Sequence, residues 1–243
     1  MEATPCSQLK AFIESAEKIC VFTGAGISCP SGIPDFRSAD GLYNEKTKWN
    51  YPPEEIISHT FFMEHTDMFY EFYKSKMIYP NAKPNAAHIY FAELEKTGKK
   101  VSVVTQNIDG LHQAAGSTEV IELHGSVHRN YCTKCRKFYD AKAVVSAEGI
   151  PRCSCGGIIK PDVVLYEEPL DEDSVMQAAK VISEADLLII IGTSLAVYPA
   201  ASYIRYFRGD KMVLINKSGT SYDGMADLAI YDDVINVVNK LKK

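Results

Sequence analysis

In ICVFTGAGIS, residues 19–28, a short apolar run passes directly into a glycine loop, and this pattern is the main evidence for the fold class. The run up to Thr23 is nearly continuous, which is typical of a strand buried on both faces of a parallel sheet. Gly24 and Gly26 follow at once. Glycines at such a turn let the backbone approach a pyrophosphate, and amides at the next helix start supply positive potential. A Gly-x-Gly alone fits an ordinary tight turn about as well.

Apolar runs of this kind recur along the chain, with helical patterns between them. Four more apolar runs predict buried strands, namely Val101–Thr105, Val120–Leu123, Leu187–Ile191 and Met212–Ile215. Apolar residues at helical spacing predict amphipathic helices within 9–16, 175–182 and 234–241. Asn85 is a suitable N-cap for a helix over Ala86–Lys96 that stops at Gly98. Strands that alternate with helices predict an α/β fold with a Rossmann-like, doubly wound parallel sheet.

Two stretches interrupt this alternation of strands and helices and predict a second, smaller domain. Residues 38–84 are aromatic and helical without a convincing strand, and residues 129–159 carry paired cysteines with little apolar periodicity. We expect residues 1–37, 85–128 and 160–243 to form the Rossmann-like domain. The smaller domain then combines a helical module over 38–84 with a zinc-ribbon module over 129–159.

Composition narrows the class of protein. The chain has 243 residues, 46% hydrophobic and 23% charged, which fits a globular protein with a full core. Its net charge of −5 argues against generic binding to nucleic acid or to anionic membranes, which needs a basic surface. No apolar segment marks the first ten residues as a signal peptide, and seven cysteines do not fit a secreted disulfide framework. We expect a cytoplasmic monomer without nucleic-acid or membrane partners.

Side chains that could bind a ligand or take part in catalysis follow the predicted strands. The segment SGIPDFR, residues 31–37, places a ring, a carboxylate and a guanidinium on one loop, a combination that a core does not need. Gln106, Asn107 and Asp109 follow one strand, and His124 follows another, at the edge where open α/β sheets bind ligands. Each also has a structural alternative, such as a polar loop, a packed histidine or an N-cap at Asp109.

These blocks, in this order, resemble the signature of the sirtuins, the NAD-dependent protein lysine deacylases. The matching motifs are GAGIS at 24–28, GIPDFR at 32–37, TQNIDGLH at 105–112, ELHG at 122–125, GTS at 192–194, VYP at 197–199, Asn216 and the paired cysteines. The resemblance extends from about Glu14 to the last predicted helix. Cys29 departs from it, because family members often carry threonine at that position.

The resemblance implies a role for each matched residue. His124 is the general base, supported in the catalytic set by Asn107 and Asp109, and an imidazole suits the role because its ordinary pKa lies near neutrality. Phe36 covers the reactive ribose carbon against water. The implied NAD-binding residues are Gly24, Ala25, Gly26, Cys29, Phe36, Arg37, Gln106, Asn107, Ile108, Asp109, His124, Thr193, Ser194, Asn216 and Asp233. The other histidines, His59, His65, His88, His112 and His128, are assigned no part in the chemistry.

The implied reaction consumes NAD. The acyl oxygen of an acyl-lysine attacks the ribose carbon as nicotinamide leaves, His124 activates a ribose hydroxyl, and hydrolysis gives free lysine and O-acyl-ADP-ribose. Protein mono-ADP-ribosyl transfer would use the same NAD site and stays an alternative. A non-catalytic adaptor that binds zinc and NAD is a third reading, and the presence of His124, Asn107 and Asp109 speaks against it. A dehydrogenase is disfavoured, since no pair of residues suits hydride transfer.

Four cysteines predict one structural zinc ion. Cys132 and Cys135 are followed by Cys153 and Cys155, a pattern that resembles a zinc ribbon whose four thiolates close a tetrahedral site. The second pair is one residue shorter than usual, and the glycines at 156 and 157 could supply the freedom for a tighter turn. A redox pair at Cys132 and Cys135 is the competing interpretation, and it leaves the second pair unexplained.

The substrate segment is implied by the resemblance as well. Val163, Val164, Leu165 and Tyr166 align with the segment that pairs with an extended acyl-lysine peptide, a mode that tolerates many sequences. Glu167 replaces a glycine that relatives often carry, and adds a carboxylate that could favour basic peptides. Members that prefer acidic acyl groups carry a Tyr-x-x-Arg motif, and no arginine occurs here between Arg37 and Arg129. A neutral acyl group is therefore expected.

Overall fold

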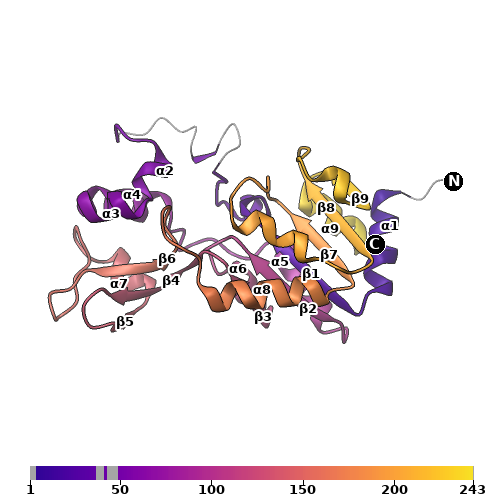
Figure 1. Ribbon diagram of the computed structural model, residues 1–243, viewed down its shortest axis with the longest axis horizontal. Helices are drawn as coiled ribbons and strands as arrows, with labels where there is room; N and C mark the ends of the chain where they lie inside the picture. Colours follow the sequence, from indigo (N-terminus) through magenta and orange to yellow (C-terminus); the bar gives the residue numbers. More distant parts are fainter. Residues whose placement is uncertain (1–3, 37–40, 43–48, 243) are drawn as a thin grey trace.

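A six-stranded parallel sheet forms the larger part of the protein. The computed structural model describes residues 4–36, 41–42 and 49–242. The strands of this sheet are β1 (Lys18–Thr23), β2 (Lys100–Thr105), β3 (Glu119–Glu122), β7 (Leu187–Ile191), β8 (Lys211–Asn216) and β9 (Leu228–Tyr231). They lie in the order β3-β2-β1-β7-β8-β9, which is the Rossmann order (Figure 1). The order reverses between β1 and β7, and the carboxyl ends of these two strands mark the point where such sheets bind ligands.

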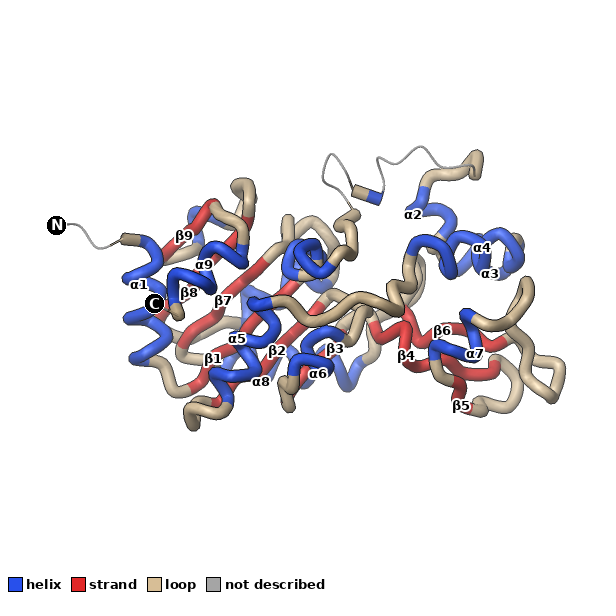
Figure 2. Tube along the Cα trace, turned by 180° about the vertical axis from the view of Figure 1, so that it is seen from behind, coloured by secondary structure: helices blue, strands red, loops and turns tan. Residues whose placement is uncertain are grey.

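Helices cover both faces of this sheet (Figures 1 and 2). One face carries α1 (Pro5–Ser15), α5 (Ala86–Glu95) and α9 (Val234–Leu241); the other carries α8 (Glu172–Glu184) and the 3-10 helix η4 (Ala200–Tyr206). Val21 faces the first core, whereas Cys20 and Phe22 face the second, which explains why the run in β1 is continuously apolar. The Asn85 side chain caps α5 by accepting a hydrogen bond from the Ala87 amide at 3.0 Å. The expected α/β class and this cap are confirmed.

The smaller module has its own core, drawn from both inserted segments. Its elements are α2 (Pro53–Ile56), α3 (His59–Glu64), α4 (Thr66–Lys76), β4 (Gly125–Cys132), β5 (Phe138–Tyr139), α7 (Ala141–Val145) and β6 (Ile159–Val163). The strands form an antiparallel sheet in the order β5-β4-β6. Phe69 and Tyr70 of α4 pack in one cluster with Cys132 and Ile159 of this sheet. The two segments thus pack together, and the limits of the domains stay a prediction.

Several elements were not anticipated from the sequence. The edge strand β9 is only four residues long, and its burial alternates, so it lacks the continuous apolar run that marks the central strands. Strands β4 to β6 escape a periodicity test because cysteines and a β-bulge interrupt their pattern. The remaining short elements are η1 (Ala25–Ile27), η2 (Cys29–Ser31), α6 (Leu111–Ala115) and η5 (Asp223–Met225). None of the helices in the described residues is both long and apolar enough to cross a lipid bilayer.

Candidate active site

A cavity of about 840 Å³ opens at the carboxyl ends of β1, β2, β7 and β8 and extends to the smaller module. Most of the residues expected to bind NAD or substrate line it: Gly24, Ala25, Gly26, Cys29, Phe36, Gln106, Asn107, Ile108, Asp109, His124, Val163, Val164, Leu165, Tyr166, Thr193, Ser194 and Asn216. Two residues that were expected to bind NAD are not found in the cavity lining. Arg37 lies outside the described residues, and Asp233 caps α9 and pairs with Lys217 at 3.0 Å without lining the cavity. The topology therefore gathers nearly all the sequence candidates at one place.

The glycine loop after β1 packs against the loop after β7. The amides of Gly24 and Gly26 donate to the carbonyls of Ile191 and Gly192 at 3.0 and 2.8 Å. A Cβ added at Gly26 would lie 2.6 Å from Gly192 Cα, and one at Gly24 would lie 2.7 Å from Thr193 Cβ. The close approach that requires these glycines is thus made by the neighbouring loop of the protein itself, a reason that the sequence did not reveal.

A chain of hydrogen bonds joins Asn107, Ser28 and Asp109. Asn107 Nδ2 donates to Ser28 Oγ at 3.1 Å and to the Gly24 carbonyl at 3.1 Å, and Ser28 Oγ donates to Asp109 Oδ2 at 2.7 Å. The other oxygen, Oδ1, accepts from the Leu111 amide at 2.9 Å, so Asp109 does stabilise the start of α6. Burial is the main influence on the Asp109 carboxyl and raises its pKa. Ser28 is buried at the centre of this network, yet the sequence singled it out only as part of a motif.

His124 lies two residues beyond β3, in the turn that leads into β4. Its Nδ1 contacts the Gln106 carbonyl oxygen at 2.8 Å. Because a carbonyl oxygen can only accept, Nδ1 carries the hydrogen and Nε2 keeps its lone pair. Burial lowers the pKa of the His124 imidazole, and the bond to Gln106 opposes this shift in part. The imidazole is therefore neutral at neutral pH, with Nε2 ready to accept a proton.

Two other histidines are buried beneath the site. His112 Nε2 lies 3.1 Å from Thr23 Oγ1, and the rings of His88 and His112 meet edge to face at 4.8 Å between centroids. Burial lowers the pKa of His88 to about 4 and that of His112 to about 3. Neither lines the cavity. The expectation that His112 packs and hydrogen-bonds locally agrees with this geometry.

The far end of the cavity lies over β7 and β8. Thr193 joins the two sides, because its hydroxyl accepts from Gln106 Nε2 at 3.1 Å and its amide donates to Asn216 Oδ1 at 3.0 Å. Asn216 Nδ2 is buried and has no partner in the described residues, so this amide offers a donor to a bound molecule. Cys29 Sγ lies 3.5 Å from the Ala25 carbonyl, and burial, followed by the nearby Asp35, raises the thiol pKa.

The segment after β6 runs beside His124. The Val164 amide donates to the His124 carbonyl at 3.0 Å, and the Tyr166 amide donates to the Ile57 carbonyl at 3.0 Å. Glu167 follows with φ +74°, in the left-handed region that favours glycine. Its carboxylate accepts from the Thr60 amide at 2.8 Å. Hydrogen bonding to Thr60, through its side chain first and its amide second, lowers the pKa of the Glu167 carboxyl. The segment is thus anchored on both sides, with Val163 to Tyr166 lining the cavity.

The four paired cysteines converge in the smaller module. Their sulfur atoms all lie within 4.8 Å of one another. Sγ–Sγ distances are 3.4 Å for Cys132–Cys155 and 3.6 Å for Cys135–Cys153. Zinc bonded to four thiolates at about 2.3 Å separates the sulfurs by about 3.8 Å, so the cluster fits one tetrahedral ion. This convergence uses both pairs, which the redox interpretation does not.

Comparison with known proteins matches this geometry to one family. The sequence model described as the Sir2 family matches residues 24–199. An NAD-dependent protein deacetylase of Clostridium acetobutylicum is 56% identical over 234 residues, which cover 96% of each chain. This chain belongs to the Sir2 family. A second relative of the same description, from Staphylococcus aureus, is 43% identical over 96% of each chain.

Solved Sir2 structures share the whole fold. A Sir2 complex with a deacetylated p53 peptide and 3′-O-acetyl-ADP-ribose superimposes with a TM-score of 0.87, at 37% identity over 96% of both chains. A Sir2 complex with a p53 peptide and NAD+ gives a TM-score of 0.83, at 38% identity over 99% of this chain and 97% of the other. The Sir2 fold therefore extends over both modules of this protein.

Proposed function

We propose that this protein is an NAD-dependent protein-lysine deacetylase that yields nicotinamide, O-acyl-ADP-ribose and free lysine. The observation that carries the proposal is the position of His124. Its ring lines a cavity at the nucleotide-binding edge of the sheet, and its backbone carbonyl holds the segment at Val164. One residue thereby faces both the proposed NAD site and the proposed peptide site.

The residues of the cavity fit an NAD molecule. Gly24, Ala25 and Gly26 start the loop, and Asn216 offers its unpaired amide at the far end. Gln106, Asn107, Ile108 and Asp109 hold the nicotinamide ribose and its base, as in the family pattern. When bound, NAD supplies a ribose carbon that loses nicotinamide and accepts the acyl oxygen. Phe36 lines the same cavity and would keep water from that carbon.

His124 moves the proton in this proposal. With Nδ1 held by the Gln106 carbonyl, Nε2 accepts a proton from a hydroxyl group in the cavity. The lowered pKa favours the unprotonated imidazole, the form that a general base needs. Asn107 and Asp109, linked through Ser28, would hold the surrounding polar groups in place.

The substrate is an acyl-lysine in an extended peptide that pairs with Val163 to Tyr166. Because no arginine lies between Arg37 and Arg129, we propose a neutral acyl group, of which acetyl is the simplest. Glu167 lies exposed at the cavity rim, where its carboxylate would favour basic peptides. We further propose that the protein acts as a cytoplasmic monomer, with one zinc ion that holds the smaller module together and takes no part in the reaction.

Nicotinamide release from NAD, with and without an acetyl-lysine peptide, tests the proposal. We expect release that depends on the peptide, together with peptide deacetylation, and the loss of both in His124→Ala. Label from NAD that stays on protein would support mono-ADP-ribosyl transfer instead. Unchanged turnover in His124→Ala would contradict the assignment of the base. Binding of NAD without any turnover would support a non-catalytic adaptor.

A further inference from the structure

The first half of β4 crosses the peptide segment very closely. Gly125 and Ser126 pair with Val163 and Asp162 of β6. A Cβ added at Gly125 would lie 1.9 Å from the Asp162 carbonyl oxygen, so only glycine fits this crossing. Because Gly125 directly follows His124, the turn that carries the proposed base and the segment proposed to bind peptide meet at one point.

A β-bulge follows this crossing, since the pairing register of β4 shifts between Ser126 and Asn130. The bulge contacts the loop after β2. The Val127 amide donates to the Ile108 carbonyl at 3.0 Å, and His128 Nε2 lies 3.0 Å from the Asp109 carbonyl oxygen. The bulge therefore rests on the part of the cavity wall that contains Ile108 and Asp109.

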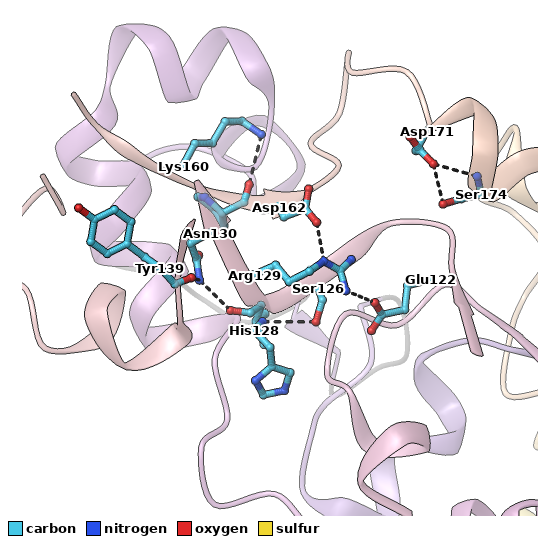
Figure 3. A network of polar contacts seen from close by, with 12 residues as sticks. Glu122, Ser126, His128, Arg129, Asn130, Tyr139, Lys160, Asp162, Asp171 and Ser174 are labelled. Carbon is cyan, nitrogen blue, oxygen red and sulfur yellow. Dashed lines mark hydrogen bonds and ion pairs between the residues drawn. The ribbon is translucent and has the colours of Figure 1, made fainter. Parts of the chain in front are cut away.

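Arg129 ends this bulge and bridges two carboxylates (Figure 3). Its Nη1 donates to Glu122 Oε2 at 2.6 Å, and its Nε donates to Asp162 Oδ2 at 2.7 Å. Glu122 is the last residue of β3, two positions before His124. Asp162 lies on β6, directly before the segment Val163–Tyr166. One guanidinium thus joins the edge of the large sheet to the strand that leads into the peptide segment.

Both contacts are charge-assisted, and the planar guanidinium suits two acceptors that lie in different directions. The Glu122 side chain is only 8% exposed, so its carboxylate depends on Arg129 for neutralisation. The other carboxylate oxygen of Glu122, Oε1, accepts a hydrogen bond from Gln113 Nε2 at 2.9 Å. The Asp162 side chain is 42% exposed, so its ion pair with Arg129 contributes little to stability and mainly fixes the orientation of the two side chains. The Glu122 contact therefore anchors Arg129, and the Asp162 contact aligns β6.

We propose that Arg129 is a positioning residue that sets the peptide segment Val163–Tyr166 at its working distance from His124. It acts through Glu122 and Asp162 and does not line the cavity. The proposal rests on the proposed deacetylase function. Loss of the bridge leaves the NAD wall and the His124–Gln106 contact in place, and loosens the strand that presents the acyl-lysine.

Steady-state kinetics with an acetyl-lysine peptide and NAD test this role in Arg129→Gln and Asp162→Asn. We expect the KM for peptide to rise roughly tenfold in Arg129→Gln, the scale of one charge-assisted hydrogen bond, with a smaller rise in Asp162→Asn. Arg129→Lys keeps the positive charge but loses the planar guanidinium. We expect its KM for peptide to lie between those of Arg129→Gln and the native protein. The Kd for NAD, measured without peptide, should stay within about twofold of the native value.

Arg208→Gln is the matched control, because within the described part of the chain the exposed Arg208 guanidinium donates only to backbone carbonyls of residues 205 and 207. We expect native kinetics from it.

A native peptide KM in both Arg129→Gln and Asp162→Asn would overturn the proposal, as would a fall in kcat that merely follows the folded fraction. If Arg129→Gln fails to fold, Asp162→Asn decides alone. An inactive native protein would contradict the proposed deacetylase function instead. The peptide Kd from fluorescence anisotropy then decides the role of Arg129: weaker binding in Asp162→Asn supports it, and equal binding overturns it.

Discussion

His124 and Asp109 are both partly buried in the cavity wall, and removal from water shifts their pKa values in opposite directions. The imidazole pKa falls and the carboxyl pKa rises, so each shift favours the uncharged form. Under the site, His88 and His112 follow the same rule more strongly. At the scale of residues, exclusion of water therefore sets protonation, and the hydrogen bonds of Gln106, Ser28 and Thr23 set orientation.

Acid should destabilise the protein through His88 and His112. Their pKa values fall from an ordinary 6.5 to about 4 and about 3 on folding, so the unfolded chain binds more protons below pH 6.5. Their contribution to stability is complete above pH 6.5 and is lost as the pH falls toward the folded values. Between pH 7.5 and 5, we expect a loss of roughly 2 kcal/mol for each histidine.

Urea denaturation at several pH values measures this loss. In His112→Gln the loss between pH 7.5 and 5 should be smaller by roughly 2 kcal/mol, the share of that one histidine. The comparison uses the change with pH, so a constant cost of the substitution cancels. An equal slope in His112→Gln and in the native protein would show that other groups cause the acid sensitivity.

Glu167 stands in a backbone conformation that suits glycine, at φ +74°. Glu167→Gly removes the strain and also the bond to the Thr60 amide, whereas Glu167→Ala removes only the bond. We therefore expect the glycine variant to melt about 2–4 °C above the alanine variant. Thermal denaturation of the two proteins side by side measures this difference, and equal melting temperatures would contradict the strain.

At the scale of elements, the loops after β1 and β7 form one interlocked unit at the switch point of the sheet. The amides of Gly24 and Gly26 donate to carbonyls at the end of β7 and in the loop after it, and neither glycine has room for a Cβ. The chain enters η1 directly from this contact, and Ser28 then reaches Asn107 and Asp109. The floor of the cavity is therefore built from three loops that hold one another in place.

Gly26→Ala should damage this unit. The added methyl would lie 2.6 Å from Gly192 Cα, and its three nearest atoms all belong to the Gly192 backbone, so the loops must separate. We expect a loss of about 1–3 kcal/mol in the free energy of unfolding, and a weaker affinity for NAD. Gly224→Ala is the control, because a Cβ there meets nothing within 4 Å. Denaturation and NAD titration of both variants check the prediction, and native values in Gly26→Ala would contradict it.

In the whole molecule, the large sheet and the smaller module are joined through the segments that flank His124 and Val164. The large sheet carries a core on each face, and the smaller module buries its aromatic side chains with Cys132 and Cys153. The cavity lies where the two parts meet, with walls from both. Its shape therefore depends on the smaller module staying folded, which makes the cysteine cluster a structural requirement for activity.

Removal of zinc should unfold the smaller module. Trp49, the single tryptophan, is buried in the core of this module and packs edge to face on Phe72, so its emission reports the module. We expect one zinc ion per chain by elemental analysis, and a red-shifted Trp49 emission with loss of deacetylation after chelation. Cys153→Ser should behave like the chelated protein, and Cys6→Ser in α1 like the native one. Unchanged emission after complete zinc removal would contradict a structural role.

The central strands, the amphipathic helices and the Asn85 cap could be predicted from the sequence, and the resemblance to the sirtuins added the candidate residues of the cavity. These features depend on local patterns, because buried strands need continuous apolar runs and caps need particular side chains beside a helix. The four cysteines belong to this group as well, since their pairing along the chain is itself a metal-ligand pattern.

Which of these residues contact one another became known only from the folded arrangement. Ser28 reaches Asp109 across 81 positions, and Arg129 reaches Asp162 across 33. The opposing backbone that makes Gly24 and Gly26 necessary comes from Gly192 and Thr193, in the loop after β7, far along the chain. Such contacts follow from the order of strands in the sheet and from the crossing at Gly125. A sequence pattern records spacing along the chain, whereas burial and hydrogen bonding depend on neighbours that only the folded topology brings into contact.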